Sequence, residues 1–177
     1  YQIIIDYKSI LKNIIFKKKK NQNIYIIIDS KIQYLIKNLK IDKNRILKIS
    51  SGEKIKSIKY YSNIINTLLK LNIDRNATII AIGGGTVGDL SGFVASTVLR
   101  GVKFILIPTT LLSQVDASIG GKNGINTPYG KNLIGTFFQP DKVIIDSSVL
   151  NSLSKREIKS GYAEILKHSL IKDIKFY

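Results

Sequence analysis

The sequence lacks cysteine and methionine and has one histidine among its 177 residues. The lack of cysteine excludes disulfides, thiolate metal sites and thiol nucleophiles. Catalytic zinc takes three protein ligands, so with His168 as its only histidine the chain is expected not to complete such a site alone. No apolar run approaches the roughly 18 residues that span a bilayer, and no signal peptide is visible, so we expect a cytoplasmic protein without membrane partners. The missing initiator methionine indicates a piece of a longer protein.

The formal net charge of +16 is unevenly distributed. Residues 1–75 carry 17 basic against 5 acidic side chains, whereas residues 76–177 carry 11 against 7. The excess is mostly lysine (24 Lys, 4 Arg) and accompanies many Ile and Asn residues, which indicates a general compositional bias. Nucleic-acid surfaces more typically use arginine with interleaved aromatics. We therefore predict no nucleic-acid partner, and a solvated loop at the dense run Lys17 to Lys20.

Apolar runs rich in β-branched residues alternate with segments of helical periodicity. Strands are predicted at residues 24–28, 45–49, 78–82, 102–108 and 142–146, and helices at residues 31–39, 57–71 and 90–99. This alternation predicts an α/β fold with a Rossmann-like parallel sheet flanked by helices.

Residues 83–89, with the sequence GGGTVGD, lie between a predicted strand and a predicted helix. Such a turn lets the backbone approach a phosphate, which the free N–H groups at the helix start favour. Gly83, Gly85 and Gly88 match G-x-G-x-x-G, but no acidic residue occurs between Asp89 and Asp116 to hold a ribose at the usual distance. Either the ribose is held differently or the site is not a standard dinucleotide site. A tight turn without a ligand is the alternative.

Polar residues cluster at the ends of three predicted strands, at residues 51–56, 83–89 and 109–110. Ligands of open parallel sheets bind at the carboxyl ends of strands. We therefore expect one ligand to contact all three clusters.

Residues 114–140 are rich in glycine and polar side chains, which predicts a long loop. Long loops in compact domains are usually functional, and lysines beside glycines can meet an anion without steric hindrance. The candidates here are Asp116, Lys122, Lys131 and Asn132. Solvent-exposed lysines without a ligand are the alternative for each taken singly.

Ser154 and Glu157 have the spacing of a capping box that starts the last helix. On that helix Glu164, Lys167 and His168 share one face, because they lie at i, i+3 and i+4. The spacing of Glu164 and His168 allows shared metal coordination, and a Glu–Lys ion pair on a solvated face is the alternative.

With these residues laid out, the chain resembles the 3-dehydroquinate synthase family. The resemblance rests on GEKIKS, GGGTVGDLSGF, RGVKFILIPTTLLSQVDASIGGKNGIN, GKNLIGTFFQP and SGYAEILKH, in the family's order and spacing. It implies an NAD-binding α/β domain at residues 1–153. Residues 154–177 are then the first helix of a truncated α-helical domain for metal and substrate.

The resemblance implies a lyase that converts 3-deoxy-D-arabino-heptulosonate 7-phosphate, a seven-carbon keto-sugar phosphate, to 3-dehydroquinate and phosphate, the second step of the shikimate pathway. NAD is reduced and reoxidised within one turnover around a phosphate elimination, and an intramolecular aldol step closes the ring. A divalent metal, zinc or cobalt, polarises the substrate hydroxyls. A homodimer is also implied, and these 177 residues alone are expected to be inactive.

The resemblance also implies roles for the residues at matching positions. The catalytic and substrate-binding residues are then Asp116, Lys122, Asn132, Lys167 and Arg100. The resemblance implies that Arg100 reaches the substrate phosphate of the neighbouring subunit and that Glu164 is a metal ligand. The cofactor-binding set is Asp29, Ser51, Gly52, Glu53, Lys54, Ile55, Lys56, Gly85, Thr86, Val87, Gly88, Asp89, Thr109, Thr110, Lys122, Lys131, Val149, Leu150, Asn151 and Ser152. Ser51 departs from the family's usual Asp, and His168 matches no family ligand.

Two other classes of function remain open from the sequence. One is a related enzyme, either a sugar-phosphate cyclase with another substrate or a metal-dependent polyol dehydrogenase. The segments GGKNGIN and GKNLIGTFFQP favour the synthase over the dehydrogenases. The other is a non-catalytic nucleotide-binding or nucleic-acid-binding remnant.

Overall fold

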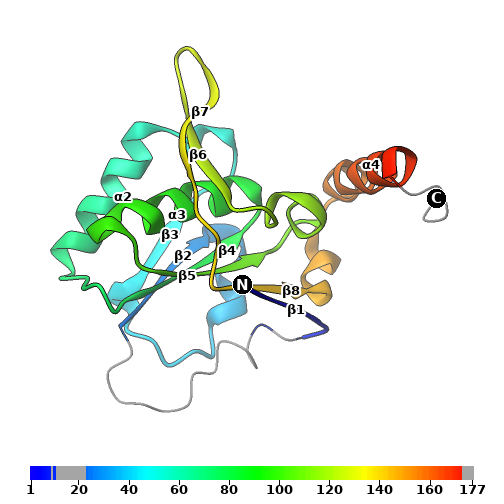
Figure 1. The fold of residues 1–177 in the computed structure, drawn as a ribbon. Helices are drawn as coiled ribbons and strands as arrows, with labels where there is room; N and C mark the ends of the chain where they lie inside the picture. The colour runs from blue at the N-terminus through cyan, green and yellow to red at the C-terminus, as the bar shows by residue number, and fades with distance from the viewer. Residues whose placement is uncertain (9, 11–22, 173–177) are drawn as a thin grey trace.

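A six-stranded parallel sheet forms the centre of the molecule, in the order β1-β8-β5-β4-β2-β3 (Figure 1). The computed structural model describes residues 1–8, 10 and 23–172. The strands of this sheet are β1 (Gln2–Asp6), β2 (Ile24–Asp29), β3 (Ile46–Ile49), β4 (Thr78–Gly83), β5 (Lys103–Pro108) and β8 (Lys142–Asp146). The predicted α/β class with a parallel sheet is therefore confirmed.

All five predicted strands are present; β2 and β4 carry runs of β-branched residues that the sheet buries, whereas β3 at the edge is only partly buried. Strand β1 was not predicted. It pairs only with β8, at the edge of the sheet, and most of its side chains are exposed. An edge strand of this kind lacks the continuous burial that makes central parallel strands recognisable from sequence.

Two apolar layers cover the sheet, one on each face. Helices α2 (Ile58–Lys70) and α3 (Gly85–Thr97) lie on one face (Figure 1). The opposite face packs against the 3-10 helix η1 (Ser30–Ile36), with a core that includes Ile26, Ile28, Ile80 and Ile82. This double coverage explains why the central strands are apolar throughout.

The helix predicted at residues 31–39 is instead the short 3-10 helix η1, interrupted by non-helical backbone at Ile32. Asp29 caps it by accepting a hydrogen bond from the Lys31 amide at 3.0 Å. Ile36 is its only buried side chain. Ile32, Leu35 and Leu39 pack against the same core but stay partly exposed, so this connection gains less of the packing that sustains a longer α-helix.

The loop predicted at residues 114–140 is largely ordered secondary structure, so that prediction was wrong in part. A π-helical turn, η5 (Ser113–Ala117), precedes an antiparallel hairpin of β6 (Lys122–Thr127) and β7 (Gly130–Phe137). The hairpin projects away from the layers (Figure 1). Because most β7 side chains are exposed, the hairpin has no apolar alternation by which its sequence could be recognised.

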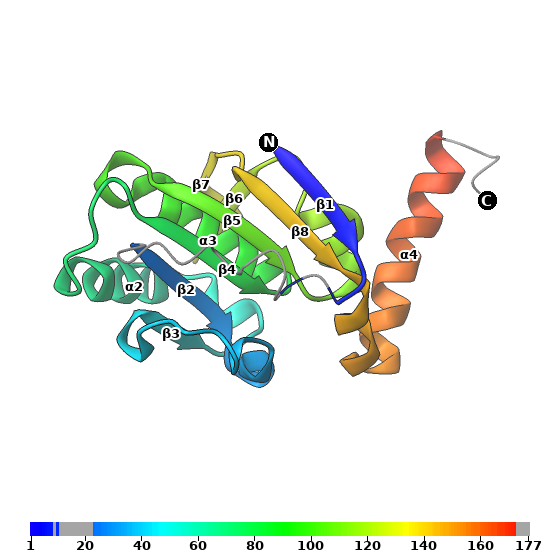
Figure 2. The same ribbon diagram turned by 90° about the horizontal axis from the view of Figure 1, so that it is seen from below.

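Helix α4 (Lys155–Lys172) begins with the predicted capping box. The Ser154 amide donates to Glu157 Oε2 at 2.9 Å, and the Glu157 amide donates to Ser154 Oγ at 3.3 Å. The helix lies beyond the carboxyl ends of the strands, beside the sheet rather than on one of its faces (Figure 2). Within the described residues, no helix is long and apolar enough to cross a membrane. The lysine run at residues 17–20 lies outside the described residues.

The carboxylate of Asp146, at the end of β8, is buried and binds backbone amides of the chain that follows β1. It accepts hydrogen bonds from the amides of Lys8 at 2.9 Å, Ile10 at 3.1 Å and Ser148 at 2.9 Å. Burial acts to raise the pKa of Asp146, but the hydrogen bonds from Ser148, Ile10 and Lys8 outweigh it, so the pKa is lowered. Because the folded-state pKa lies below the unfolded value of about 3.9, Asp146 stabilises the fold above that pH and loses its contribution as the pH falls.

We expect Asp146→Asn to lower the free energy of unfolding at pH 7 by about 1–3 kcal/mol, because its amide group cannot accept all these bonds. The difference from wild type should shrink as the pH falls below about 4. Urea unfolding between pH 7 and pH 3 measures both effects. Asp6→Asn is the matched control, since Asp6 is exposed and pairs in register with Asp146. A destabilisation equal at every pH would contradict this role for the ionised carboxylate.

Candidate functional site

The glycine turn after β4 brings the start of α3 to the carboxyl edge of the sheet. A Cβ atom at Gly83 would lie 2.6 Å from Cβ of Val87, so only glycine permits this close turn. The Gly84 carbonyl accepts from the amides of Val87 and Gly88, both at 3.0 Å. No side chain caps α3, which leaves the first amides of the helix available to an anion.

The three polar clusters predicted to share a ligand do meet at this edge. The Thr109 amide donates to the Gly83 carbonyl at 2.9 Å, which joins the end of β5 to the glycine turn. From the segment after β3, the Lys56 ammonium donates to Asp89 Oδ2 on α3 at 2.5 Å. The sheet order makes this possible, because β4 lies between β5 and β2 where the strand order reverses.

Asp89 and Lys56 form an ion pair that is largely withdrawn from solvent. The Lys56 side chain is 5% exposed and that of Asp89 is 23% exposed. Burial raises the pKa of Asp89, and the hydrogen bond from Lys56 opposes that rise. The Lys56 ammonium also donates to Asn132 Oδ1, on the hairpin.

A cavity of about 620 Å³ opens between α3, η5 and the hairpin. This volume lies in the range of small-molecule sites. Its lining includes four of the predicted site residues, Asp89, Asp116, Lys122 and Asn132. The remaining lining residues are Ala117, Ile119, Gly120, Asn123, Gly124, Leu133, Gly135, Thr136 and Phe137.

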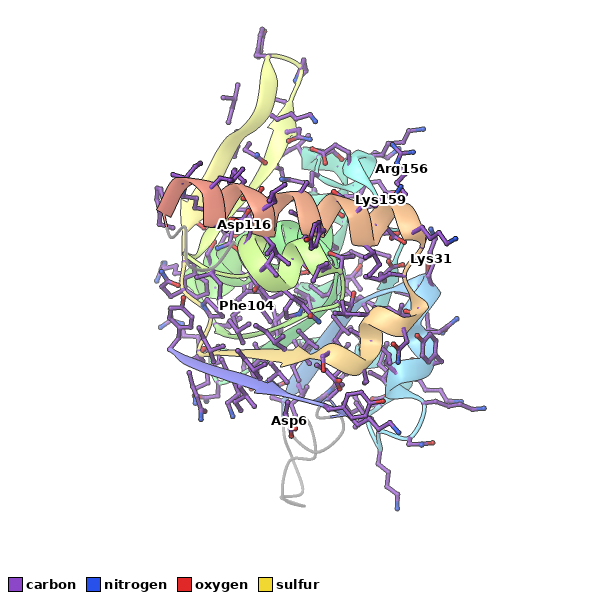
Figure 3. All side chains as sticks on the ribbon, turned by 90° about the vertical axis from the view of Figure 1, so that its right-hand side faces the viewer. Asp6, Lys31, Phe104, Asp116, Arg156 and Lys159 are labelled. Carbon is purple, nitrogen blue, oxygen red and sulfur yellow. The ribbon has the colours of Figure 1, made fainter. Side chains whose placement is uncertain are left out.

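Helix α4 passes close to Asp116, which is labelled in Figure 3, and brings Glu164 and His168 to it. The ligand atoms of Asp116, Glu164 and His168 all lie within 4.8 Å of one another. His168 Nε2 is 3.3 Å from Glu164 Oε1 and 3.8 Å from Asp116 Oδ1. Carboxylate oxygens and imidazole nitrogens are ordinary zinc ligands, so this donor set fits a divalent metal.

The sequence spacing indicated that Glu164 and His168 could coordinate one metal. The tertiary structure adds Asp116 as a third donor. The alternative ion pair is also present, because the Lys167 ammonium contacts Glu164 Oε1. The hydrogen bond that Lys167 donates to Glu164 raises the pKa of Lys167. A metal held by Glu164 would therefore lie beside the Lys167 ammonium group, which pairs with the same carboxylate and is half-exposed.

Several predicted site residues lie outside this cluster. Arg100 is exposed and follows the far end of α3, a 13-residue helix, which is roughly 20 Å from the glycine turn. Residues 149–152 belong to the 3-10 helix η6 (Ser147–Ser152), where Val149 is buried in the core. Asp29 is 8% exposed, and its carboxylate already caps η1.

The sequence analysis did not identify Asn126 as a site residue. Its Nδ2 donates to Glu53 Oε1 at 2.7 Å, and its Oδ1 accepts from the Asn132 amide at 3.0 Å. The Asn126 amide also donates to the Lys56 carbonyl at 2.8 Å. No local pattern marks such a residue, because its partners come from distant segments.

The chain is similar in sequence to known 3-dehydroquinate synthases. The family model described as 3-dehydroquinate synthase N-terminal matches residues 46–160. The 3-dehydroquinate synthase of Pelagibacter ubique is 60% identical over 128 residues, which are 72% of this chain and 35% of that protein. The 3-dehydroquinate synthase of Dictyoglomus turgidum is 46% identical over 178 residues, covering 100% of this chain and 50% of that protein.

Solved structures of two cyclases share the fold. The 2-epi-5-epi-valiolone synthase of Streptomyces hygroscopicus, with NAD+ and Zn2+ bound, is 27% identical with a TM-score of 0.87 and covers 99% of this chain and 51% of its own. A 2-deoxy-scyllo-inosose synthase complexed with NAD+ and Co2+ is 26% identical with a TM-score of 0.81, covering 96% of this chain and 48% of its own. The chain thus spans a third to a half of the length of its curated relatives.

Proposed function

We propose, from the premise that this chain belongs to the 3-dehydroquinate synthase family, that the full-length protein converts 3-deoxy-D-arabino-heptulosonate 7-phosphate to 3-dehydroquinate and phosphate. The observation that carries the proposal is the cavity, which joins Asp116, Lys122 and Asn132 to Asp89 at the glycine turn. The proposed dinucleotide site and the proposed ionic substrate contacts would thereby be adjacent, as an oxidation of the substrate requires.

NAD is the proposed cofactor, since both cyclases with the same fold are named as holding it. The uncapped start of α3 would hold the pyrophosphate with its free amides. Asp89, Thr109 and Thr110 would contact the remainder of the cofactor from neighbouring strand ends. Val87 is buried, so only its backbone could take part.

A divalent metal, zinc or cobalt, is the second proposed partner, with Glu164 as its ligand from α4. Asp116 and His168 lie close enough to share it or to orient it. When bound, NAD supplies a reversible hydride transfer and the metal polarises substrate hydroxyls.

The side chains of this chain have separate roles toward the substrate. The Lys122 and Lys167 ammonium groups would bind its phosphate and carboxylate by charge-assisted hydrogen bonds. Asp116, half-exposed beside the cavity, would accept a hydrogen bond from a hydroxyl. These contacts would hold the charged groups of the substrate and would leave a hydroxyl at Asp116, beside the residues proposed to hold the metal.

We further infer a homodimer in which Arg100 serves the partner subunit. Its position beyond the far end of α3 supports this, because it is too distant from the glycine turn to serve the site of its own chain. A related cyclase is the second candidate, supported by the shared fold at 26% and 27% identity. Identities of 46% to 60% with curated synthases favour the first.

Phosphate release from the seven-carbon keto-sugar phosphate tests the function in the full-length gene product. The release should require NAD and zinc, should stop after chelation and should yield 3-dehydroquinate. NAD binding without release would favour a cyclase with another substrate. The absence of both NAD binding and phosphate release would contradict the proposal.

A further inference from the structure

Lys56 is a buried lysine whose ammonium joins two parts of the site. Its carboxylate partner, Asp89, lies on α3, and its amide partner, Asn132, lies at the start of β7. The family resemblance implies that Lys56 contacts the cofactor. In the structure its ammonium group donates hydrogen bonds to protein groups on both sides.

The hairpin meets the segment around Lys56 through its outer half. Strands β6 and β7 form a two-stranded sheet that projects beyond the helices (Figure 1), and an isolated parallel bridge joins Asn126 of β6 to Ser57. Asn126 ties β6 to the segment around Lys56 through its amide and through Glu53. Lys56 itself holds β7, because its ammonium group donates to Asn132 Oδ1.

Asn132 is held in an unusual conformation by two bonds. Its φ is +57°, in the left-handed region, which asparagine tolerates better than most residues. Its amide donates to Asn126 Oδ1 and its Oδ1 accepts from Lys56. The backbone and the side chain of Asn132 are therefore each fixed by a separate partner.

We propose that Lys56 is a positioning residue: it fixes which end of the Asn132 side-chain amide faces the substrate. An ammonium group has donors and no acceptor, so it can face only the oxygen of the Asn132 side chain. The Nδ2 group is thereby left for the cavity that Asn132 lines, as a donor for a carboxylate, phosphate or hydroxyl oxygen. The catalytic part of this inference rests on the proposed function.

The test compares variants of the full-length protein loaded with NAD, with the seven-carbon keto-sugar phosphate as substrate. Lys56→Met should raise KM by about 10- to 100-fold, the effect of losing a hydrogen bond to a charged group, and should change kcat less. It should speed hydrogen exchange in residues 122–137 while leaving the affinity for NAD close to wild type. Lys59→Met is the matched control, because Lys59 is exposed on α2 three residues away.

Three further single variants, Asn132→Asp, Asn132→Ala and Lys56→Arg, keep the test decisive if Lys56→Met fails to fold, and a double variant extends it if Lys56→Met folds. Asn132→Asp retains the pairing with Lys56 but presents only acceptors, so it should raise KM at least as much as Asn132→Ala. Lys56→Arg should restore part of the substrate affinity. The double variant Lys56→Met with Asn132→Ala should be no worse than Asn132→Ala alone, because the two residues act in series.

Other outcomes would overturn the inference. A large loss of NAD affinity in Lys56→Met with unchanged exchange of the hairpin would make Lys56 a cofactor ligand. Additive effects of Lys56→Met and Asn132→Ala on KM would show that the two residues act independently. An Asn132→Asp variant with wild-type KM would show that substrate binding does not need the Nδ2 donor of Asn132. If the wild type shows no turnover, the proposed function fails, whereas hydrogen exchange and NAD titration still test the tie between Lys56 and the hairpin.

Discussion

Replacing Glu164 with glutamine in the full-length protein is expected to abolish stoichiometric zinc binding. The loss of affinity should exceed the roughly 100-fold that removal of an outer-shell partner can cost. The carboxylate of Glu164 is 17% exposed and converges with Asp116 and His168, so its negative charge is the part of this donor set best shielded from water. A neutral amide of the same shape removes that charge and leaves the packing of α4 intact.

Zinc titration of NAD-loaded protein, followed by metal analysis after gel filtration, measures this loss without relying on turnover. Glu157→Gln is the control, since it makes the same change two turns earlier on the same helix. Glutamine can also complete a capping box, so this control should fold and bind zinc normally. Retention of one tightly bound zinc per chain by Glu164→Gln would rule out Glu164 as a metal ligand.

A second large effect is expected for Gly161→Ala, at the contact between α4 and the turn before η5. A Cβ atom at Gly161 would lie 2.5 Å from Cγ of Leu111 and 2.7 Å from the backbone nitrogen of Leu112. The backbone atom cannot rotate away, so α4 must shift outward and carry Glu164 away from Asp116. Overpacking of this kind costs about 1–3 kcal/mol, which outweighs the gain of about 1 kcal/mol in helix propensity.

The measurement combines urea unfolding with the same zinc titration. Ser160→Ala is the matched control, because Ser160 is exposed and the change improves helix propensity without entering a contact. Gly161→Ala should be less stable than this control and should bind zinc more weakly. Equal stability and equal zinc affinity of the two variants would contradict the close approach of α4.

The strands of the sheet could be predicted because burial on both faces selects β-branched residues. Residues 78–82 and 24–28 are the clearest cases, and both are fully or almost fully buried strands. The capping box of α4 was equally recognisable, since its two residues lie three positions apart and contact each other directly. Each of these features is local in the chain.

The hairpin and the helix η1 could not be predicted in the same way. Residues 122–137 gain their order from partners such as Glu53, Lys56 and Ser96, which lie far away in the sequence. Residues 31–39 have apolar residues at helical spacing, but only Ile36 is buried, and Ile32, Leu35 and Leu39 pack against the core while partly exposed. Periodicity does not reveal how deeply a segment packs into the core.

By itself, the sequence determined the residue types of the site and their order: a glycine turn after a buried strand, lysines beside glycines, and Glu164 with His168 on one helix face. Only the tertiary structure decided which of these groups act together. Lys56 is 33 residues from Asp89 and 76 from Asn132, yet it donates to both. Asp116 joins Glu164 and His168 because α4 lies beyond the carboxyl ends of the strands. Spacing along a chain predicts contacts within a turn of helix, whereas contacts between segments depend on how the sheet orders its strands.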